Sequence, residues 1–266
     1  KLHLSKSGYY NYLHRKPSKQ SISKKERMQA IQTIYDDNHQ IYGAPKIAKE
    51  MQKKGEKISQ RTVGVYMREM GIRACYIKPY VKTTFDSDFS TKLHNILKRD
   101  FSPSKPNEAW CTDITYIFTL EGFVYLTSVM DLYSRKIIAW TLSRTLEVEE
   151  VLKCIEMARK RIKTSNPVII HSDRGVHYTS KLYKKLTAGL ILSYSKKGTP
   201  WDNACIESFH SVIKREWLNR TLIYDYDHAY DLCFEYIETF YNTIRIHSHC
   251  GYESPNQYEN NYYSKH

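Results

Sequence analysis

The sequence lacks the features that mark membrane and secreted proteins. No apolar run approaches the ~20 residues needed to cross a bilayer, and the first residues, KLHLSKSGYY, lack the apolar stretch of a signal peptide. The six cysteines are scattered and no two form a CxxC pair, so neither a zinc ribbon nor a disulfide framework is indicated. We therefore expect a protein of the reducing cytosol that has no membrane contact.

Acidic residues are scarce in the first part of the chain. Residues 1–100 contain 21 Lys and Arg against 9 Asp and Glu, whereas residues 101–266 contain 20 against 19. Nearly all of the net charge of +13 therefore belongs to the first hundred residues. Such a surface favours a polyanionic partner, which here would be double-stranded DNA. The alternative is a basic domain whose charge only keeps it soluble.

Two short amphipathic segments in this basic part predict a helix-turn-helix at about residues 45–71. Pro45 suits a first helical turn and Gly55 would end that helix, while Ser59 would cap the second helix, which ends at Gly71. The second helix would offer basic side chains to base edges or phosphates; a structural hairpin with a solvated face is the alternative. The candidate DNA contacts in this region are Lys46, Gln60, Arg61, Arg68 and Arg73.

The second part of the chain predicts an α/β domain with a mixed sheet. Three strands close together in sequence predict an antiparallel meander: WCTDITYIF at 110–118, FVYLTSVMD at 123–131 and KIIAWTLS at 136–143. Helical and strand patterns then alternate, with strands at 167–172 and 191–195 and a helix from about 203 to 219. This order of elements matches a ribonuclease H-like core, by analogy of fold.

Three carboxylates occupy places that such a sheet would bring together. Asp113 lies inside the first strand, where a charge is costly to bury unless it is paired or bound to metal. Asp173 follows the fourth strand in HSDRGVHYTS, and its alternative role is an Asx turn. Glu207 lies one turn into a helix that Asp202 or Asn203 can cap. Oxygen ligands select Mg²⁺ or Mn²⁺, and two such ions can activate a nucleophile and stabilise a leaving oxygen.

Several residues near these carboxylates are candidate DNA contacts. Lys214 shares the helix face of Glu207 and could hold a phosphate. Arg174 could touch phosphate or only stabilise its turn. Three residues of the loop before Glu207 could contact DNA or only pack within the loop: Lys196, Lys197 and Trp201. We expect packing for His171 and a turn role for Asp131, and no zinc site at His247, His249 and Cys250, since no cysteine partner is nearby.

Four motifs resemble, in order, the catalytic core of bacterial insertion-sequence transposases of the DDE group, whose core is of the retroviral-integrase type. The motifs are WCTDITYI, DLYSRKIIAW, HSDRGVHYTS and DNACIESFHSVIKRE. The upstream YGAPKIAKEMQKKGEKISQRTVGVYMREMGIRA resembles their helix-turn-helix, and the resemblance spans roughly residues 5–260. It implies a ribonuclease H-like fold and metal-dependent DNA strand cleavage and strand transfer at the ends of an insertion sequence. Carried over by motif, the catalytic and metal-binding residues are Asp113, Asp173 and Glu207. The 33 residues between Asp173 and Glu207 are slightly fewer than is usual in the family.

The resemblance also implies partners. Such proteins are often the product of the second of two reading frames, so the upstream product is an expected partner, and paired DNA ends require a dimer or larger assembly in the bacterial cytosol at the nucleoid. Two alternatives stay open: a non-catalytic DNA-binding regulator, and a structure-selective nuclease that cuts without joining. The expected parts are a basic helical region at 1–77, a linker at 78–105, the catalytic core at 106–245 and a C-terminal tail at 246–266.

Overall fold

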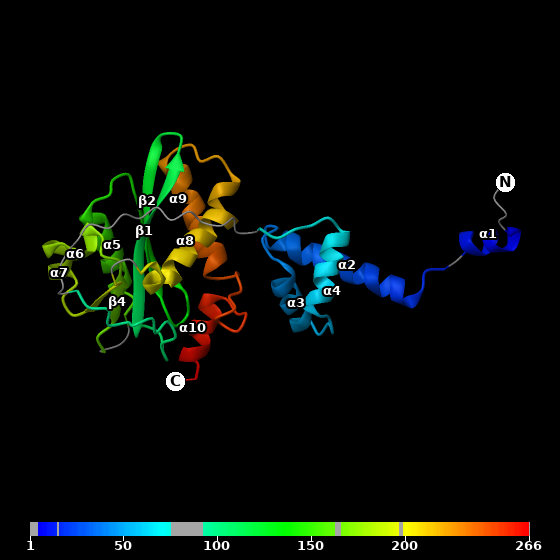
Figure 1. Cartoon of the computed structure of the whole chain (residues 1–266), viewed down its shortest axis with the longest axis horizontal. Helices are drawn as coiled ribbons and strands as arrows, with labels where there is room; N and C mark the ends of the chain where they lie inside the picture. The colour runs from blue at the N-terminus through cyan, green and yellow to red at the C-terminus, as the bar shows by residue number, and fades with distance from the viewer. Residues whose placement is uncertain (1–4, 15, 76–92, 163–165, 197–198, 266) are drawn as a thin grey trace. The chain divides into compact units, whose positions relative to one another are not determined.

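The computed structural model describes residues 5–14, 16–75, 93–162, 166–196 and 199–265. The chain divides into two compact units, residues 1–75 and 76–266 (Figure 1). Most of the expected linker at 78–105 falls at residues 78–92, outside the described residues. Within the described ranges, no helix combines the length and the apolar character that a membrane crossing requires.

The first unit is entirely helical where it is described. Gly55 and Gly71 adopt φ of +89° and +71°, the left-handed conformation that ends helices, as predicted. The Ser59 hydroxyl accepts a hydrogen bond from the Thr62 N–H at 3.1 Å, which confirms the expected cap. The predicted helix-turn-helix is therefore confirmed as a pair of helices. The helices are α1 (Lys6–Leu13), α2 (Lys19–Asp37), α3 (Ala44–Lys53) and α4 (Gln60–Glu69).

The second unit is built on a five-stranded mixed sheet of order β3-β2-β1-β4-β5. The first three strands form the predicted antiparallel meander, and β4 and β5 continue the sheet in parallel with β1. The two strands that carry or precede the candidate aspartates are thus neighbours, as the ribonuclease H-like order requires. The strands are β1 (Ala109–Thr119), β2 (Gly122–Asp131), β3 (Ile137–Ser143), β4 (Ile169–Ser172) and β5 (Ile191–Tyr194).

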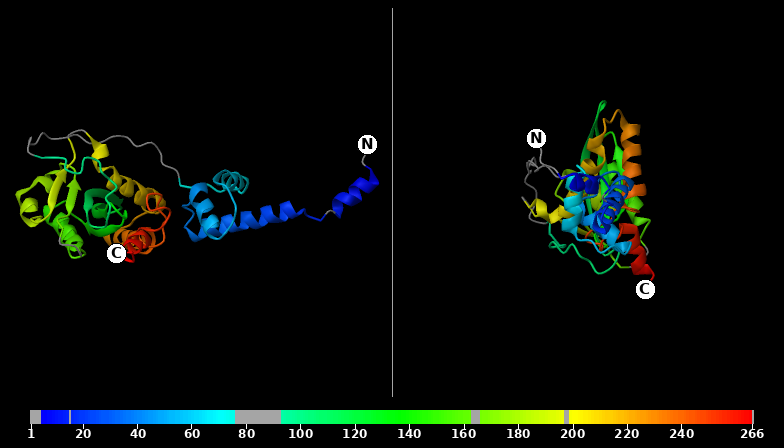
Figure 2. Two further views of the ribbon diagram at one scale, coloured as in Figure 1. Left: turned by 90° about the horizontal axis from the view of Figure 1, so that it is seen from below. Right: turned by 90° about the vertical axis from the view of Figure 1, so that its right-hand side faces the viewer.

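Helices cover both faces of this sheet (Figures 1 and 2). On one face Trp110 of β1 is buried in a core with α5 (Val148–Arg159) and with Tyr178 and Tyr183, which lie in the short helices α6 (Val176–Thr179) and α7 (Lys181–Leu186). The helix α8 (Ala204–Glu216), predicted from about 203 to 219, contacts β1 and β2 and ends three residues earlier than predicted. A sheet held between helices in this way buries its central strands on both sides.

The C-terminal tail packs on the core as part of the second unit. After α9 (Tyr226–Phe234) and the π-helical segment η3 (Glu235–Tyr241), the chain ends in α10 (Pro255–Tyr263). Lys136 forms an ion pair with Glu259 of α10, and the rings of Tyr133 and Tyr258 stack with centroids 4.9 Å apart. The described end of the expected linker also joins the core, because the N–H groups of Ile96 and Leu97 both donate to Ser193 Oγ at 2.9 Å.

Candidate active site

Asp113 lies where β1 loses its parallel neighbour. The last register pair of β1 with β4 is Cys111 with His171, and β1 then continues to Thr119 paired only with β2 on its other edge. Asp113 is half-buried, with 21% of its side chain exposed. Its position therefore lets a charged side chain stay partly in water while the strand around it is buried.

Asp173 follows β4 directly and combines the two roles that the sequence left open. Its Oδ1 accepts a hydrogen bond from the Gly175 N–H at 2.8 Å, so the Asx turn is present. A Cβ added to Gly175 would lie only 3.0 Å from the same oxygen, so a side chain at Gly175 would crowd the carboxylate. The turn thereby fixes the Asp173 carboxylate at the end of the strand. The carboxylate still acts on the site, because its charge contributes to the raised pKa of Glu207.

Glu207 lies in the first turn of α8 and interacts electrostatically with both aspartates. The pKa of its carboxyl group is raised to about 7, first by partial burial and then by the negative charges of Asp113 and Asp173. The residue as a whole is exposed to solvent, and the charges of the two aspartates act on its carboxyl group in addition to burial. The sheet and α8 thus bring together three carboxylates that are remote in sequence.

The donor set suits a hard divalent cation in its chemistry, since all three side chains offer only oxygen. Asn203 adds a fourth oxygen nearby: its Nδ2 donates to the Thr112 carbonyl at 3.2 Å, and its buried Oδ1 accepts no hydrogen bond from the residues that the structure describes. Within those same residues, however, no three His, Cys, Asp or Glu side chains lie close enough to hold one ion. The carboxylates are therefore gathered but not drawn into a single coordination sphere.

His210 contacts Asp113, although it was not among the candidate residues selected from the sequence. It is buried in α8, with Nδ1 3.4 Å from Asp113 Oδ2 and Nε2 3.4 Å from Ser128 Oγ. Ser128 is also the register partner of Asp113 across β1 and β2. One assignment satisfies both contacts, with Nδ1–H facing the carboxylate and Nε2 facing the hydroxyl. The only available signal was its spacing, one helical turn after Glu207.

Lys214 reaches the same region from the far end of α8. Its Nζ lies 4.3 Å from the centroid of the Tyr116 ring. Burial lowers the pKa of Lys214, while the charge of Asp113 acts in the opposite direction. The structure therefore places this candidate phosphate contact beside Asp113, close to the position expected from the helix periodicity.

Asp202 anchors the loop before α8. Of the two candidate caps, Asp202 and Asn203, the structure has Asn203 as the N-cap residue of α8, and its side chain forms no capping bond. Asp202 accepts hydrogen bonds from Arg99 Nε at 2.5 Å, Asn95 Nδ2 at 2.9 Å and the Lys196 N–H at 2.8 Å. Burial favours the neutral acid, but these bonds prevail and lower the pKa of Asp202 to about 2.

The four candidate contacts around this loop differ in their surroundings. Arg174 Nε donates to the Ser195 carbonyl at 2.8 Å and Nη2 to the Leu93 carbonyl at 3.3 Å, which supports its role in the turn. Trp201 is exposed, at 64%, and Lys196 is exposed as well. Lys197 lies outside the described residues.

Two polar residues near the site have structural roles. His171 is fully buried, with Nδ1 2.8 Å from Ser193 Oγ and Nε2 3.1 Å from Ser195 Oγ, and burial lowers its pKa to about 4. Asp131 accepts hydrogen bonds from the N–H groups of Asn107, Tyr133 and Ser134. Both observations agree with the packing and turn roles expected for them.

In the first unit, four of the five candidate DNA contacts are exposed: Gln60, Arg61, Arg68 and Arg73. Lys46 differs, because its Nζ lies 4.6 Å from the centroid of the Tyr42 ring. The side chain of Lys46 thus packs against its own unit, while the start of α4 presents its polar groups to solvent.

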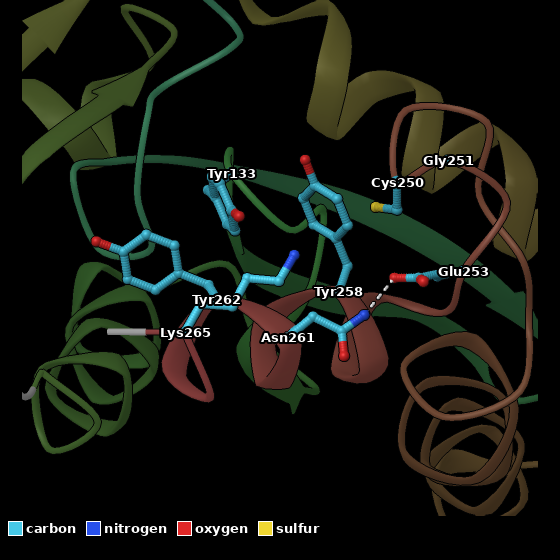
Figure 3. Close-up of a pocket in the computed structure, with 8 residues that line it drawn as sticks. All are labelled: Tyr133, Cys250, Gly251, Glu253, Tyr258, Asn261, Tyr262 and Lys265. Carbon is cyan, nitrogen blue, oxygen red and sulfur yellow. Dashed lines mark hydrogen bonds between the residues drawn. The ribbon is translucent and has the colours of Figure 1, made fainter.

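A cavity of about 360 Å³ lies between α10 and the preceding loop (Figure 3). The residues that line it do not include Asp113, Asp173 or Glu207. Tyr133, Tyr258 and Tyr262 form much of its wall. Cys250 donates to the Ser134 carbonyl at 3.2 Å, and His249 Nε2 lies 3.1 Å from the Tyr133 carbonyl oxygen. Both residues therefore contribute to packing of the tail.

The sheet order and its helices define an integrase-type, ribonuclease H-like core. Residues 103–200 and 188–255 match the Integrase core domain family, and residues 23–80 match the HTH-like domain family. The transposase for insertion sequence element IS904 of Lactococcus lactis is 34% identical over 249 residues, which cover 93% of this chain and 98% of that protein. The transposase InsF for insertion sequence IS3A of Escherichia coli is 33% identical over 266 residues, which cover 97% and 91%.

The chain belongs to this family of insertion-sequence transposases, and it is a DNA transposase of the DDE type. Membership favours this activity over the regulator and the nuclease. Among solved structures, the HTLV-2 integrase catalytic core domain in complex with magnesium aligns with a TM-score of 0.45 and 16% identity, covering 59% of this chain and 98% of that chain. The assignment rests on the sequence relatives.

Proposed function

We propose that Asp113, Asp173 and Glu207 are the catalytic residues with which this transposase cleaves and joins DNA strands at the ends of its insertion sequence. The observation that supports the proposal is the placement of the three carboxylates on packed elements: Asp113 is on β1, Asp173 follows the neighbouring strand β4, and the helix of Glu207 contacts Asp113 through His210. The charges of both aspartates also contribute, after burial, to the raised pKa of Glu207. Mutual repulsion of this kind is costly, and it is relieved when positive charge enters the site.

Divalent cations, Mg²⁺ or Mn²⁺ and in our proposal two of them, would be held by these three side chains and would supply Lewis-acid activation of a reacting oxygen. The protein's own part is to position the ligands. The Asx turn holds Asp173, His210 and β1 hold Asp113, and α8 carries Glu207. Lys214 adds a positive charge next to Asp113, where it can bind a non-bridging phosphate oxygen of the reacting strand.

The helix-turn-helix of the first unit would bind double-stranded DNA through the start of α4. Gln60 and Arg61 lie there and are exposed, which supports a role for them in contacting base edges or phosphates. Because the two ends of an element must be held together, we further propose that the chain works as a dimer or larger assembly on DNA, with the product of an upstream reading frame as a partner.

Strand-transfer assays on labelled element ends test the catalytic assignment. Asp173→Asn and Glu207→Gln keep the size of each side chain and remove its charge, so both should abolish joining and cleavage while the affinity for end DNA stays largely unchanged. Asp231→Asn, an exposed change on α9, is the matched control and should join normally. Branched products at wild-type yield from either site variant would reject the proposal.

A further inference from the structure

Three aromatic rings form an exposed cluster on the β1–β2 hairpin. Tyr116, Phe118 and Phe123 are 58%, 63% and 52% exposed. The ring centroids of Tyr116 and Phe123 are 5.5 Å apart, as are those of Phe118 and Phe123, and both pairs meet edge to face. We call these three residues the hairpin aromatic cluster. Contiguous apolar groups of this kind on a surface mark a binding site more often than single exposed residues do.

The strand alternation explains why the cluster has no cover. Tyr116 and Phe118 point to the face on which Trp110 is buried against α5, but they lie further along β1. Thr115 and Ile117, on the opposite face, are buried. Figure 1 shows the paired ends of β1 and β2 reaching past α5, with α9 beside them. The fold therefore exposes apolar side chains on only one face of this hairpin.

The cluster and the candidate active site share a strand and a lysine. Tyr116 follows Asp113 by three residues, which corresponds to about 10 Å along a strand. Lys214, from the helix that carries Glu207, places its Nζ 4.3 Å from the Tyr116 ring centroid. Since Asp113 and Tyr116 point to opposite faces, Lys214 reaches the ring past the edge of β1 that β4 has left. A strand of DNA at the carboxylates would thus meet the cluster next.

We propose that the hairpin aromatic cluster stacks against an unpaired base of the DNA strand whose phosphate lies at the candidate carboxylates. Stacking on aromatic rings accepts every base, because each base has a π-face. Lys214 favours DNA over an apolar protein partner: an apolar surface would take water from its ammonium group, at a cost, whereas a DNA phosphate would pair with it. This inference rests on the proposed position of the active site.

Two labelled duplexes that differ at one end test the proposal with the full chain. One duplex is flush, and the other ends in a few unpaired nucleotides; affinities are measured by fluorescence anisotropy. Phe118→Leu and Phe123→Leu remove ring faces and keep apolar side chains. Each should weaken binding to the frayed duplex by roughly fivefold to a hundredfold, the range that loss of base stacking gives, and leave the flush duplex unaffected. Phe234→Leu, an exposed phenylalanine of α9 (48%), is the matched control and should change neither affinity.

Three results would overturn the proposal. The first is a wild-type chain that does not prefer the frayed duplex, and the second is a preference that survives Phe118→Leu. The third is a change in sedimentation without a change in DNA affinity, which would make the cluster a protein contact. Asp113→Asn separates this proposal from the catalytic one, because it should lose strand transfer and keep the preference for frayed ends. If Asp113→Asn still joined DNA, the catalytic assignment would fail while the stacking surface stood.

Discussion

The buried ion pair between Glu216 and Arg245 provides a perturbation with a large expected effect. Both side chains are less than a tenth exposed. Arg245 donates from Nε and Nη2 to the two carboxylate oxygens of Glu216, each at 2.7 Å, and the Tyr236 hydroxyl donates to Oε2 at 2.7 Å. Glu216 is the last residue of α8, so this cluster fixes the far end of the helix that carries Glu207.

Replacing Arg245 with methionine should lower the free energy of unfolding of the second unit by about 3–5 kcal/mol, the usual cost of removing one member of a buried pair. Glu216 would keep the Tyr236 hydroxyl and the more distant Arg215, whose Nη2 lies 3.6 Å from Oε1, and would lose its two closest charged donors. The double variant Glu216→Gln with Arg245→Met should recover much of that loss, because it removes the buried negative charge and keeps an acceptor for Tyr236. The comparison separates the cost of a buried charge from the cost of lost packing.

Urea unfolding followed by tryptophan fluorescence can measure these effects. All four tryptophans, Trp110, Trp140, Trp201 and Trp217, belong to the second unit, so the signal does not report on the helical first unit. A single variant within about 1 kcal/mol of wild type would refute the reasoning, since a solvated surface pair is worth no more than that. A double variant as unstable as the single one would show that packing, and not charge, sets the cost.

Three further predictions follow from the contacts of the site. First, folding raises the pKa of Glu207 from 4.5 to about 7, so the contribution of this group to stability is complete below pH 4.5 and is lost as the pH rises through 7. The urea midpoint of Glu207→Gln should therefore rise relative to that of wild type as the pH increases across this window. A difference in midpoint that does not change with pH would contradict the shift. Second, His210→Phe should weaken Mn²⁺ binding by about 10- to 100-fold, as loss of a residue that orients a metal ligand commonly does; Mn²⁺ titration by electron paramagnetic resonance measures this directly, and unchanged affinity would limit His210 to packing. Third, Arg61→Ala should reduce by about one the slope of log DNA affinity against log salt concentration. Arg174→Ala, which loses hydrogen bonds to two carbonyl groups, should mainly lower the urea midpoint. A large change in the salt slope for Arg174→Ala would reverse its assignment to the turn.

Local patterns in the sequence were sufficient to predict the elements on which the site is built. The alternation of side chains along WCTDITYIF predicted β1, because residues in the second half of this strand are alternately buried and exposed. The glycines at 55 and 71 marked the ends of α3 and α4 because only a left-handed residue ends a helix cheaply in that way. The neighbouring positions of β1 and β4 came from the order of elements, and the parallel register confirms them.

Contacts between remote residues could not be read from the sequence. Asp202 and Asn203 were both candidate caps because they precede a helix; Asn203 is the N-cap residue, whereas Asp202 pairs with Arg99, about a hundred residues earlier in the chain. His210 has no local pattern that distinguishes it from a core residue, and only the pairing of Asp113 with Ser128 gives it two polar partners. The exposed face of the hairpin was equally hidden, since Tyr116 and Phe118 follow the same alternation as the buried Trp110.

We propose that Asp113, Asp173 and Glu207 form one divalent-metal site for DNA strand transfer. Anomalous diffraction from a crystal that contains Mn²⁺ and end DNA tests it most directly. We predict anomalous peaks within coordination distance of all three carboxylates, with the reacting strand alongside. Manganese bound elsewhere, or carboxylates that stay apart in an ordered complex with DNA, would contradict the claim and leave Asp173 with its turn as its only role.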